Sequence, residues 1–193
     1  TGTSGALNRS TTASISVIVP IVAGASFLKT DTTTQGTWKG VYGAQGYALA
    51  ADATNYPAYA QVTFTGNTTA TWTSTTSDVR ALQKAATADR LAATWTSGTS
   101  YSIDVNLTDG LWHQVSLYNL DWDTTGRTQT IDILDASSGA VLDTRSVASF
   151  NAGKGLEWNL AGHVTIRVTR TGGLNAAVSG IFFDPPAPPD FNI

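Results

Sequence analysis

The sequence predicts an all-β protein, an antiparallel β-sandwich or jelly roll with at most one or two short helices. Three observations support this class. Short extended or alternating runs recur at spacings of about 8–12 residues, turn signals that contain Gly separate them, and one stretch alone has a helical composition. A chain of 193 residues is long enough for one such domain with a substantial core.

The first half of the chain predicts a strand near its start and a hairpin further on. Ile15, Val17 and Val19 alternate with other residues ahead of Pro20, which is typical of a strand with one buried face. The runs 60–64 and 69–72 are rich in β-forming residues and are separated by a Gly-Asn turn signal. This pattern predicts a β-hairpin.

A repeated pentapeptide and an insertion follow. ATWTS occurs at 70–74 and again at 93–97, and we expect each copy to form a strand. The insertion over 77–90 connects them and is the stretch with helical composition, with Asp78 placed to cap a short helix. The alternating run 101–107 predicts a further strand.

The clearest group of strands lies between His113 and Ser146. Three runs of β-forming or alternating residues are separated by two tripeptides that end in Gly. The runs are 113–122, 128–134 and 140–147, and the tripeptides are Thr124–Gly126 and Ser137–Gly139. Because Gly adopts the positive φ that tight hairpins need, this pattern predicts an antiparallel meander.

The end of the chain predicts two more strands, over 164–169 and 177–183. The segment 184–189, DPPAPP, does not continue a sheet, since proline has no N–H to donate. The expected organisation is a flexible leader over 1–13, one β-sandwich domain over 14–184 and a Pro-rich tail or linker over 185–193.

The composition excludes several classes of function. A net charge of −3 and a charged fraction of 13% provide no basic cluster for nucleic acid or an anionic membrane. The most apolar run, Ile15–Phe27, is too short for membrane insertion. The chain has no cysteine, which rules out disulfides and thiolate chemistry. It also has no methionine, so we expect a fragment or a processed, secreted product.

Catalytic signatures are sparse. The sequence contains no nucleophile elbow, and His113 and His163 each lie where a strand is expected to begin, with contacts to backbone or water. Glycoside hydrolysis needs a pair of carboxylates. Glu157 is the single glutamate. One interpretation makes it a buried acid beside the aromatic Trp158, but nothing nearby in the sequence supplies a partner, so we expect it to face solvent. The sequence therefore predicts no enzymatic activity.

One oxygen-rich loop points to a metal. Asp121, Asp123 and Thr125 alternate ahead of a glycine, and Asp132 falls at the twelfth position, which partly matches a calcium-binding loop. A strand over 128–134, with the aspartates bonded to their own backbone, explains the same residues with fewer assumptions. Calcium at Asp121 and Asp123 is therefore a minority hypothesis, and no other cofactor is expected.

Aromatic residues in an exposed loop are the main candidates for ligand binding. Trp38, Tyr42 and Tyr47 lie among four glycines in the segment 29–47, which predicts an irregular surface loop. Flat aromatic rings in such loops suit the apolar face of a sugar ring. The tryptophans in strand-like runs are expected in the core instead: Trp72, Trp95 and Trp158.

Polar contacts to sugar hydroxyls are expected from two places. Asp78 and Arg80 lie on the insertion, and Trp122 and Arg127 lie beside the first turn of the predicted meander. The alternative explanation for the insertion is that its acidic and basic residues form local ion pairs, which only pin it to the sandwich.

Several motifs together carry a resemblance to a known type of domain. They are TDTTTQGTWKGVYGAQGY, SDVRALQ, DRLAATW, LYNLDWDTTGRTQTIDILDASSGAVLDTRS and NAAVSGIFF. Over about residues 25–183 they resemble an uncharacterised domain that recurs in large secreted bacterial multidomain proteins. Its pattern is similar to that of the galactose-binding-like β-sandwiches, which include many carbohydrate-binding modules, an analogy at the level of fold. The resemblance implies an extracellular or cell-surface location beside other domains of the same polypeptide.

These observations favour a non-catalytic carbohydrate-binding module of an extracellular bacterial protein, with a polysaccharide or glycan as its partner. The residues expected to bind the ligand are Trp38, Tyr42, Tyr47, Asp78, Arg80, Trp122 and Arg127. The alternative is a structural or adhesive domain that self-associates into fibres or surface layers. In that case the apolar strand 14–22 completes the sheet of a neighbouring copy.

Overall fold

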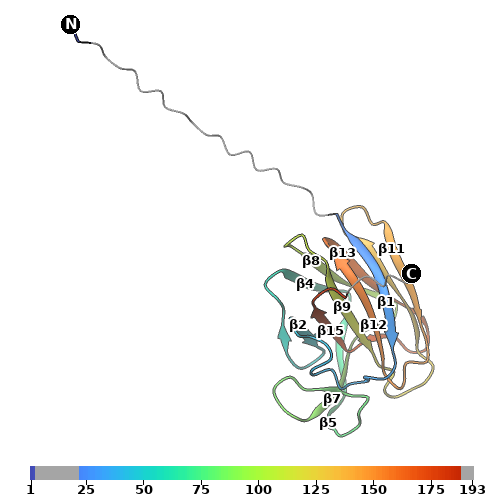
Figure 1. The fold of residues 1–193 in the computed structure, drawn as a ribbon. Helices are drawn as coiled ribbons and strands as arrows, with labels where there is room; N and C mark the ends of the chain where they lie inside the picture. Colours follow the sequence, from blue (N-terminus) through green and yellow to red (C-terminus); the bar gives the residue numbers. More distant parts are fainter. Residues whose placement is uncertain (3–21, 188–193) are drawn as a thin grey trace, which may run out of the picture.

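The computed structural model describes residues 1–2 and 22–187 (Figure 1). Within these ranges the chain forms fifteen strands and no helix, and the strand pairs are antiparallel. The prediction of an all-β, antiparallel β-sandwich is confirmed.

The strands of the described ranges form three sheets, here called A, B and C. Sheet A has the order β1 (Gly24–Asp31), β12 (Lys154–Ala161), β9 (His113–Asn119), β15 (Gly180–Asp184), β2 (Gly46–Leu49), β3 (Thr54–Asn55). Sheet B has the order β11 (Val141–Val147), β10 (Thr128–Asp135), β13 (His163–Gly172), β8 (Ser100–Leu107), β4 (Ala60–Thr65). Sheet C has the order β14 (Ala176–Val178), β7 (Arg90–Ser97), β5 (Thr68–Thr76), and β6 (Leu82–Gln83) pairs with β7.

The main core lies between the inner faces of these sheets. In β8 every second residue is buried, as its alternating sequence predicts. The large, fully buried side chains that meet in this core include Ile103, Leu107, Leu117, Ile131, Ile133, Trp158, Leu160 and Ile166. Trp95 and Trp158 belong to the core as predicted, and Trp72 packs against it half-buried.

A second hydrophobic cluster, here called the outer cluster, lies on the opposite face of sheet A. The segment between β1 and β2 and the segment between β5 and β7 fold over side chains that point outward from β9 and β15. The members of the outer cluster are Trp38, Tyr42, Leu49, Ala81, Leu82, Ala92, Tyr118, Leu120 and Phe182.

Two of the predicted strand pairings are wrong. β4 and β5 flank the predicted Gly-Asn turn, but β4 pairs with β8 in sheet B and β5 pairs with β7 in sheet C. In the predicted meander, β10 and β11 form a hairpin, whereas β9 pairs with β12 and β15 in sheet A. A turn signal predicts where the chain reverses, but the sheet in which the next strand finds its partner depends on distant residues.

The prediction of a short helix within 77–90, capped by Asp78, is also wrong. Asp78 Oδ1 accepts a hydrogen bond from the backbone N–H of Arg80, so Asp78 stabilises a turn rather than a helix. β6 then pairs with β7, which brings Leu82 into the outer cluster. Burial of Leu82 outweighs a weak local helix propensity. As predicted, each of the two ATWTS copies that the insertion connects lies in a strand, β5 or β7. The two strands pair, with Ala70 opposite Thr94.

Some predictions fall on residues that the structure does not describe. These are the strand at 15–19, most of the leader and residues 188–193 of the tail. The last part of the apolar run 15–27 lies in β1, which begins at Gly24. In the part of the chain that is described, no helix has the length and apolarity needed to cross a membrane.

Candidate functional site

The aromatic residues predicted to be exposed in a loop are packed in or against the outer cluster, so that prediction is wrong. Trp38 and Tyr42 are 5% and 8% exposed, and Tyr47 is half-buried. The centroid of the Trp38 ring lies 4.8 Å from that of Tyr47 and 5.3 Å from that of Phe182. The Trp38 indole N–H also donates to the carbonyl oxygen of Gln83 at 2.7 Å. The Trp38 ring is therefore a core element rather than a binding platform.

Close packing between two backbones explains why Gly36 is a glycine in the segment 29–47. A Cβ at Gly36 would lie 2.0 Å from the carbonyl oxygen of Ala81. The Gly36 N–H donates to the carbonyl of Val79, and the Gly36 carbonyl accepts from the N–H of Gln83. Glycine is needed here because two backbones approach closely, and the sequence pattern alone does not distinguish this use from a flexible loop.

The predicted polar residues of the insertion pin it to the sandwich, in agreement with the alternative explanation. Arg80 forms an ion pair with Asp78 at 2.9 Å, and its Nη1 donates to the carbonyl oxygen of Asn151 at 2.9 Å. The Arg80 guanidinium carbon lies 4.6 Å from the ring centroid of the half-buried Trp122. Its hydrogen-bonding groups are therefore engaged within the protein.

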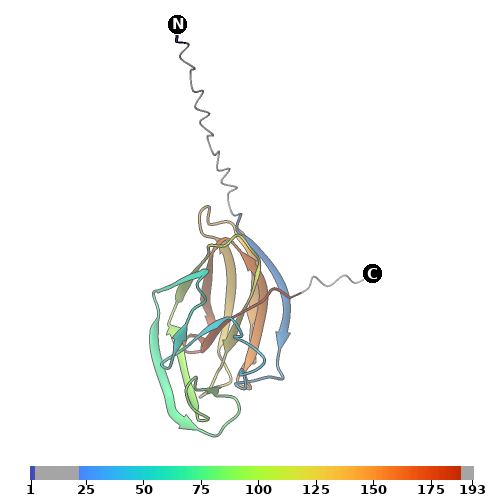
Figure 2. The same cartoon turned by 60° about the vertical axis from the view of Figure 1, so that its left-hand side comes forward.

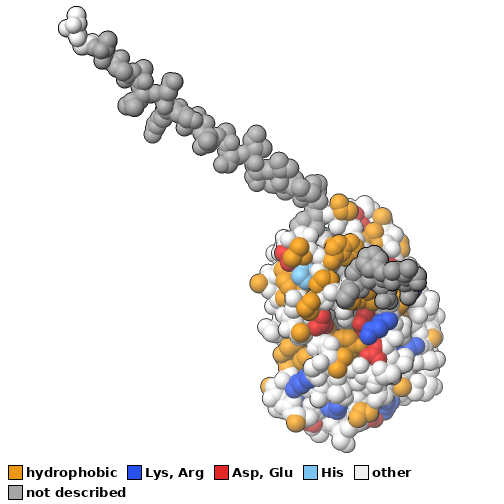
Figure 3. All heavy atoms as spheres, in the orientation of Figure 1, with side chains coloured by type: hydrophobic (Ala, Val, Ile, Leu, Met, Phe, Trp, Pro, Cys, Tyr) orange, Lys and Arg blue, Asp and Glu red, His pale blue; other side chains and the backbone are white. Residues whose placement is uncertain are grey.

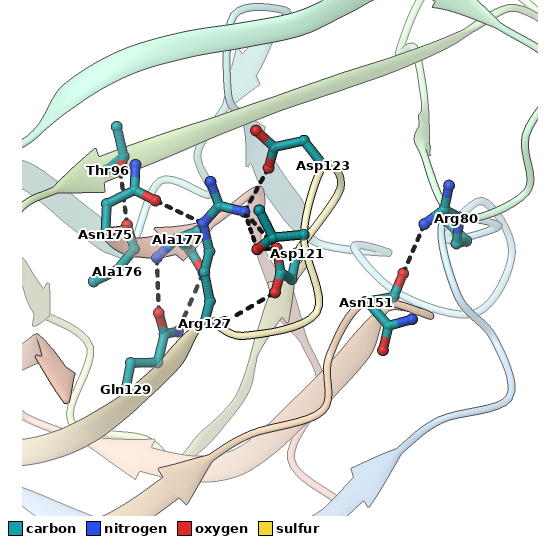
Figure 4. Close-up of polar contacts among 11 residues, drawn as sticks. Arg80, Thr96, Asp121, Asp123, Arg127, Gln129, Asn151, Asn175, Ala176 and Ala177 are labelled. Carbon is teal, nitrogen blue, oxygen red and sulfur yellow. Dashed lines mark hydrogen bonds and ion pairs between the residues drawn. The ribbon is translucent and has the colours of Figure 1, made fainter. Parts of the chain in front are cut away.

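Arg127 lies in a separate, buried network (Figure 4). Figure 4 shows its side chain pointing between Asp121 and Asp123, and its Nη1 forms ion pairs with both carboxylates. Its Nε donates to Asn175 Oδ1 at 2.6 Å. Burial raises the pKa of Asp121, but hydrogen bonds from Thr124 and Arg127 outweigh burial and keep that pKa below its usual value. The network stabilises the crossing from β9 to β10 rather than a surface site.

The calcium hypothesis does not fit this arrangement. The cationic guanidinium of Arg127 already contacts Asp121 and Asp123. Asp132, at the twelfth position, pairs instead with Arg167 at 2.8 Å. Among the residues described, no group of three or more His, Cys, Asp and Glu side chains is placed to hold a metal ion. We therefore assign no calcium site to this loop.

The two histidines bond carboxylates rather than the predicted backbone or water. His113 Nε2 lies 3.0 Å from Asp109 Oδ2, and the His113 ring stacks on Tyr59 with centroids 3.7 Å apart. His163 Nε2 lies 2.8 Å from Asp104 Oδ1. Each histidine therefore has a carboxylate partner where its strand begins: Asp109 is four residues before His113, whereas Asp104 lies on β8, beside β13.

An open pocket lies on the outer face of sheet A, beside the outer cluster. It has a volume of about 480 Å³ and is lined by Leu28, Lys29, Val41, Tyr42, Gln114, Glu157 and Ala187. Acidic and basic side chains lie side by side on this face, among hydrophobic ones (Figure 3). The pocket therefore combines charged, amide and apolar groups.

Glu157 lies in this pocket, and the prediction that it faces solvent without a partner is wrong. Its side chain is 3% exposed. Its Oε1 accepts a hydrogen bond from the Tyr42 hydroxyl at 2.7 Å and lies 3.5 Å from Lys29 Nζ, while Oε2 accepts from Gln114 at 3.0 Å. Tyr42 and Gln114 are 115 and 43 residues away in the sequence, so no local motif indicates these partners.

Tyr42 joins Glu157 to a second carboxylate. The hydroxyl oxygen also lies 2.5 Å from Asp31 Oδ2, so the two carboxylates share the single phenol proton. Burial, together with the hydrogen bonds and charges of Asp31 and Glu157, raises the pKa of Tyr42 far above its usual value, so the phenol stays protonated. Burial raises the pKa of Asp31, but hydrogen bonds from Thr34, Tyr42 and Thr33 outweigh burial and keep that pKa well below its usual range. Asp31 is therefore an ionised acceptor at neutral pH.

These two carboxylates are not arranged for glycoside hydrolysis. Glycosidases place the scissile bond between two carboxyl groups. Here the Tyr42 hydroxyl bonds both Asp31 and Glu157 and fills the space between them. The pocket is better suited to binding, because Glu157 offers an acceptor while Gln114 and Lys29 offer donors.

Trp112 is an exposed aromatic residue that sequence reasoning missed. It is 45% exposed and is the one aromatic among the large exposed hydrophobic side chains of the described residues. Its ring lies against β1, since an ideal Cβ on Gly24 would be 2.6 Å from Trp112 Cη2. Gly24 pairs with Ala161 of β12. Ala161, Asn159 and Glu157 alternate along the outward side of β12, so the ring and the pocket share one face, about 13 Å apart along the strand.

Tyr42→Phe tests the bridge between the two carboxylates. The variant keeps the ring that stacks on Phe182 but leaves Glu157 buried without the hydroxyl donor. We expect the free energy of unfolding to fall by about 1–3 kcal/mol, the cost of a buried group that loses its partner, as measured by urea denaturation. Tyr59→Phe is the control, because the Tyr59 hydroxyl bonds the exposed Gln45. A Tyr42 variant no less stable than the Tyr59 variant would contradict the bridge.

Comparison of the chain with protein-family models, with curated proteins and with solved structures finds no match. The class of protein is defined by the fold and the site alone: it is a β-sandwich with an open polar pocket and an exposed tryptophan on the outer face of one sheet.

Proposed function

We propose that the chain is a non-catalytic glycan-binding module whose ligand lies on the outer face of sheet A. The observation that supports the proposal is the presence, on one face, of the exposed Trp112 ring and the polar pocket around Glu157. A sugar ring presents an apolar C–H face and directed hydroxyl groups. Aromatic rings and fixed hydrogen-bonding groups are the protein surfaces that complement these two features.

The two contact regions have different roles in this proposal. Trp112 stacks on one sugar ring, and Glu157 accepts hydrogen bonds from the hydroxyls of another. Gln114 and Lys29 donate to the same sugar. The separation of about 13 Å along β12 exceeds the width of a single sugar ring. The proposed ligand is therefore an oligosaccharide or polysaccharide.

Affinity gel electrophoresis with a panel of soluble polysaccharides tests the proposal. We expect at least one polysaccharide to retard the wild-type protein. Trp112→Ala is expected to weaken that binding about tenfold, the change that corresponds to about 1.4 kcal/mol. Glu157→Gln is expected to weaken it as well, since an amide accepts hydrogen bonds less strongly than a carboxylate.

Leu174→Ala is the matched control, because Leu174 is an exposed hydrophobic residue in the loop between β13 and β14. This variant is expected to bind as the wild type does. Thermal melts of all three variants check that they are folded. Failure of every polysaccharide to retard the wild type would reject the proposal, as would equal binding by the Trp112 and Leu174 variants.

A further inference from the structure

The segment Pro185–Ala187 crosses the proposed ligand-binding face. β15 ends at Asp184, which lies opposite Gln114 of β9. Ala187 lies on Asn159 of β12, the next strand of the sheet. Figure 2 shows the chain after β15 running across the sheet toward the side of β1. The segment therefore passes over the face rather than away from it.

Asn159 holds this segment by a reciprocal pair of hydrogen bonds. Its Nδ2 donates to the carbonyl oxygen of Ala187 at 3.0 Å, and its Oδ1 accepts from the N–H of Ala187 at 3.1 Å. Pro185 and Pro186 are exposed and have no N–H. Within Pro185–Ala187, the two bonds from Asn159 are the hydrogen bonds that join the segment to the sandwich. The attachment of the segment therefore depends on the Asn159 side chain.

Asn159 lies between the two proposed contact regions, the Trp112 ring and the pocket around Glu157. Along the outward side of β12 it falls between Ala161, whose β1 partner contacts the Trp112 ring, and Glu157. Ala187 itself lines the pocket with Glu157. A glycan that spans the face therefore has to pass the place that Ala187 occupies.

The same atoms of Asn159 suit a sugar. A side-chain amide offers an acceptor and donors, and two neighbouring hydroxyls offer the complementary donor and acceptor. The backbone N–H and carbonyl of Ala187 use these amide atoms in the structure. The segment and a bound glycan therefore compete for one set of hydrogen-bonding groups.

We propose that Pro185–Ala187 is a displaceable strap, which occupies Asn159 within the same chain and has to leave before a glycan spans the face. The identity of the competing ligand rests on the proposed function. The strap itself is measurable without any glycan, so that the two proposals fail separately.

Ala187→Pro in the full chain tests the strap, because it removes the N–H that Asn159 Oδ1 accepts. Ala187→Gly keeps that N–H and is the matched control. In NMR spectra the side-chain amide signals of Asn159 are expected to move toward those of a free amide in A187P and to stay in place in A187G. A synthetic peptide DPPAPPDFNI, which copies residues 184–193, is expected to bind A187P, to restore the wild-type signals and not to bind the wild type. Unchanged Asn159 signals in A187P, or no peptide binding by it, would overturn the strap.

Glycan binding tests the competition. Compared with the wild type, A187P is expected to bind the same polysaccharide about three- to tenfold more tightly. In the wild type, an excess of the closed form over the open form by about that ratio weakens the apparent affinity by roughly the same factor. A187G is expected to bind as the wild type does. Equal affinity of A187P and the wild type would overturn the competition. Peptide binding by A187P with no polysaccharide bound by any variant would keep the strap and reject the proposed function.

Discussion

Replacing Trp38 with Ala is expected to lower the free energy of unfolding by about 3–5 kcal/mol, the usual range for truncating a buried large aromatic residue. Trp38 is almost fully buried against Tyr47 and Phe182, and its indole N–H bonds the carbonyl of Gln83. The variant loses the packing and also leaves the part-buried carbonyl of Gln83 without its donor. Urea denaturation followed by circular dichroism measures the change, since that signal does not depend on tryptophan emission.

Trp112→Ala is the matched control for this prediction. It removes the same side chain from an exposed position, where substitutions usually change stability by about 0.5 kcal/mol or less. Equal stability of the two variants would contradict the burial of Trp38 and with it the outer cluster. It would also restore Trp38 as a candidate for ligand contact.

Replacing Arg127 with Met is expected to lower the free energy of unfolding by about 3–5 kcal/mol, since removing one partner of a buried ion pair leaves the other charge uncompensated. Asp121 is fully buried and keeps no cation in this variant. The control is Arg167→Met, because Arg167 is exposed where it pairs with Asp132. Its expected cost is about 1 kcal/mol or less, and an equal cost for both variants would contradict the burial of the Arg127 pair.

The effect of Arg127→Met is also expected to depend on pH. The pKa of Asp121 is depressed in the folded protein. Its contribution to stability is therefore fully present above its unfolded pKa of about 3.9 and is lost as the pH falls through the lower, folded value. The difference between the wild type and the variant is expected to be largest above about pH 5 and to shrink in acid. A constant difference down to the acid transition would contradict this account.

The fold class follows from local sequence, whereas the strand pairing does not. The alternation in β8 predicts which residues enter the core, and Gly139 supplies the turn between β10 and β11 with a φ of 73°. The turn at Gly66 is also real, with a φ of 83°. Yet β4 and β5 go to different sheets, because their partners, β8 and β7, are selected by packing over long sequence separations.

The candidate site was harder to predict for a related physical reason. A glycine-rich segment with aromatic residues indicates a loop, but the burial of Trp38 depends on Phe182 and on β6, which lie far away in the sequence. Glu157 has no nearby partner in the sequence, although Tyr42 and Gln114 bond it in the fold. The exposed Trp112 lies two residues after an Asp-Gly pair, Asp109-Gly110. Such a pair is a turn signal, and an aromatic residue so close to a turn is a usable signal for a surface position.

Tyr42 belongs to two environments, since its ring packs in the outer cluster and its hydroxyl lies in the pocket. Because one side chain serves both, ligand affinity and the packing of the segment 32–45 are thermodynamically linked. A ligand that binds only the native pocket raises the melting temperature by mass action. Conversely, loosening the outer cluster reduces the fraction of molecules that are competent to bind, and so raises the apparent Kd without touching any ligand contact. The affinity of the pocket is therefore set partly by hydrophobic packing that no ligand reaches.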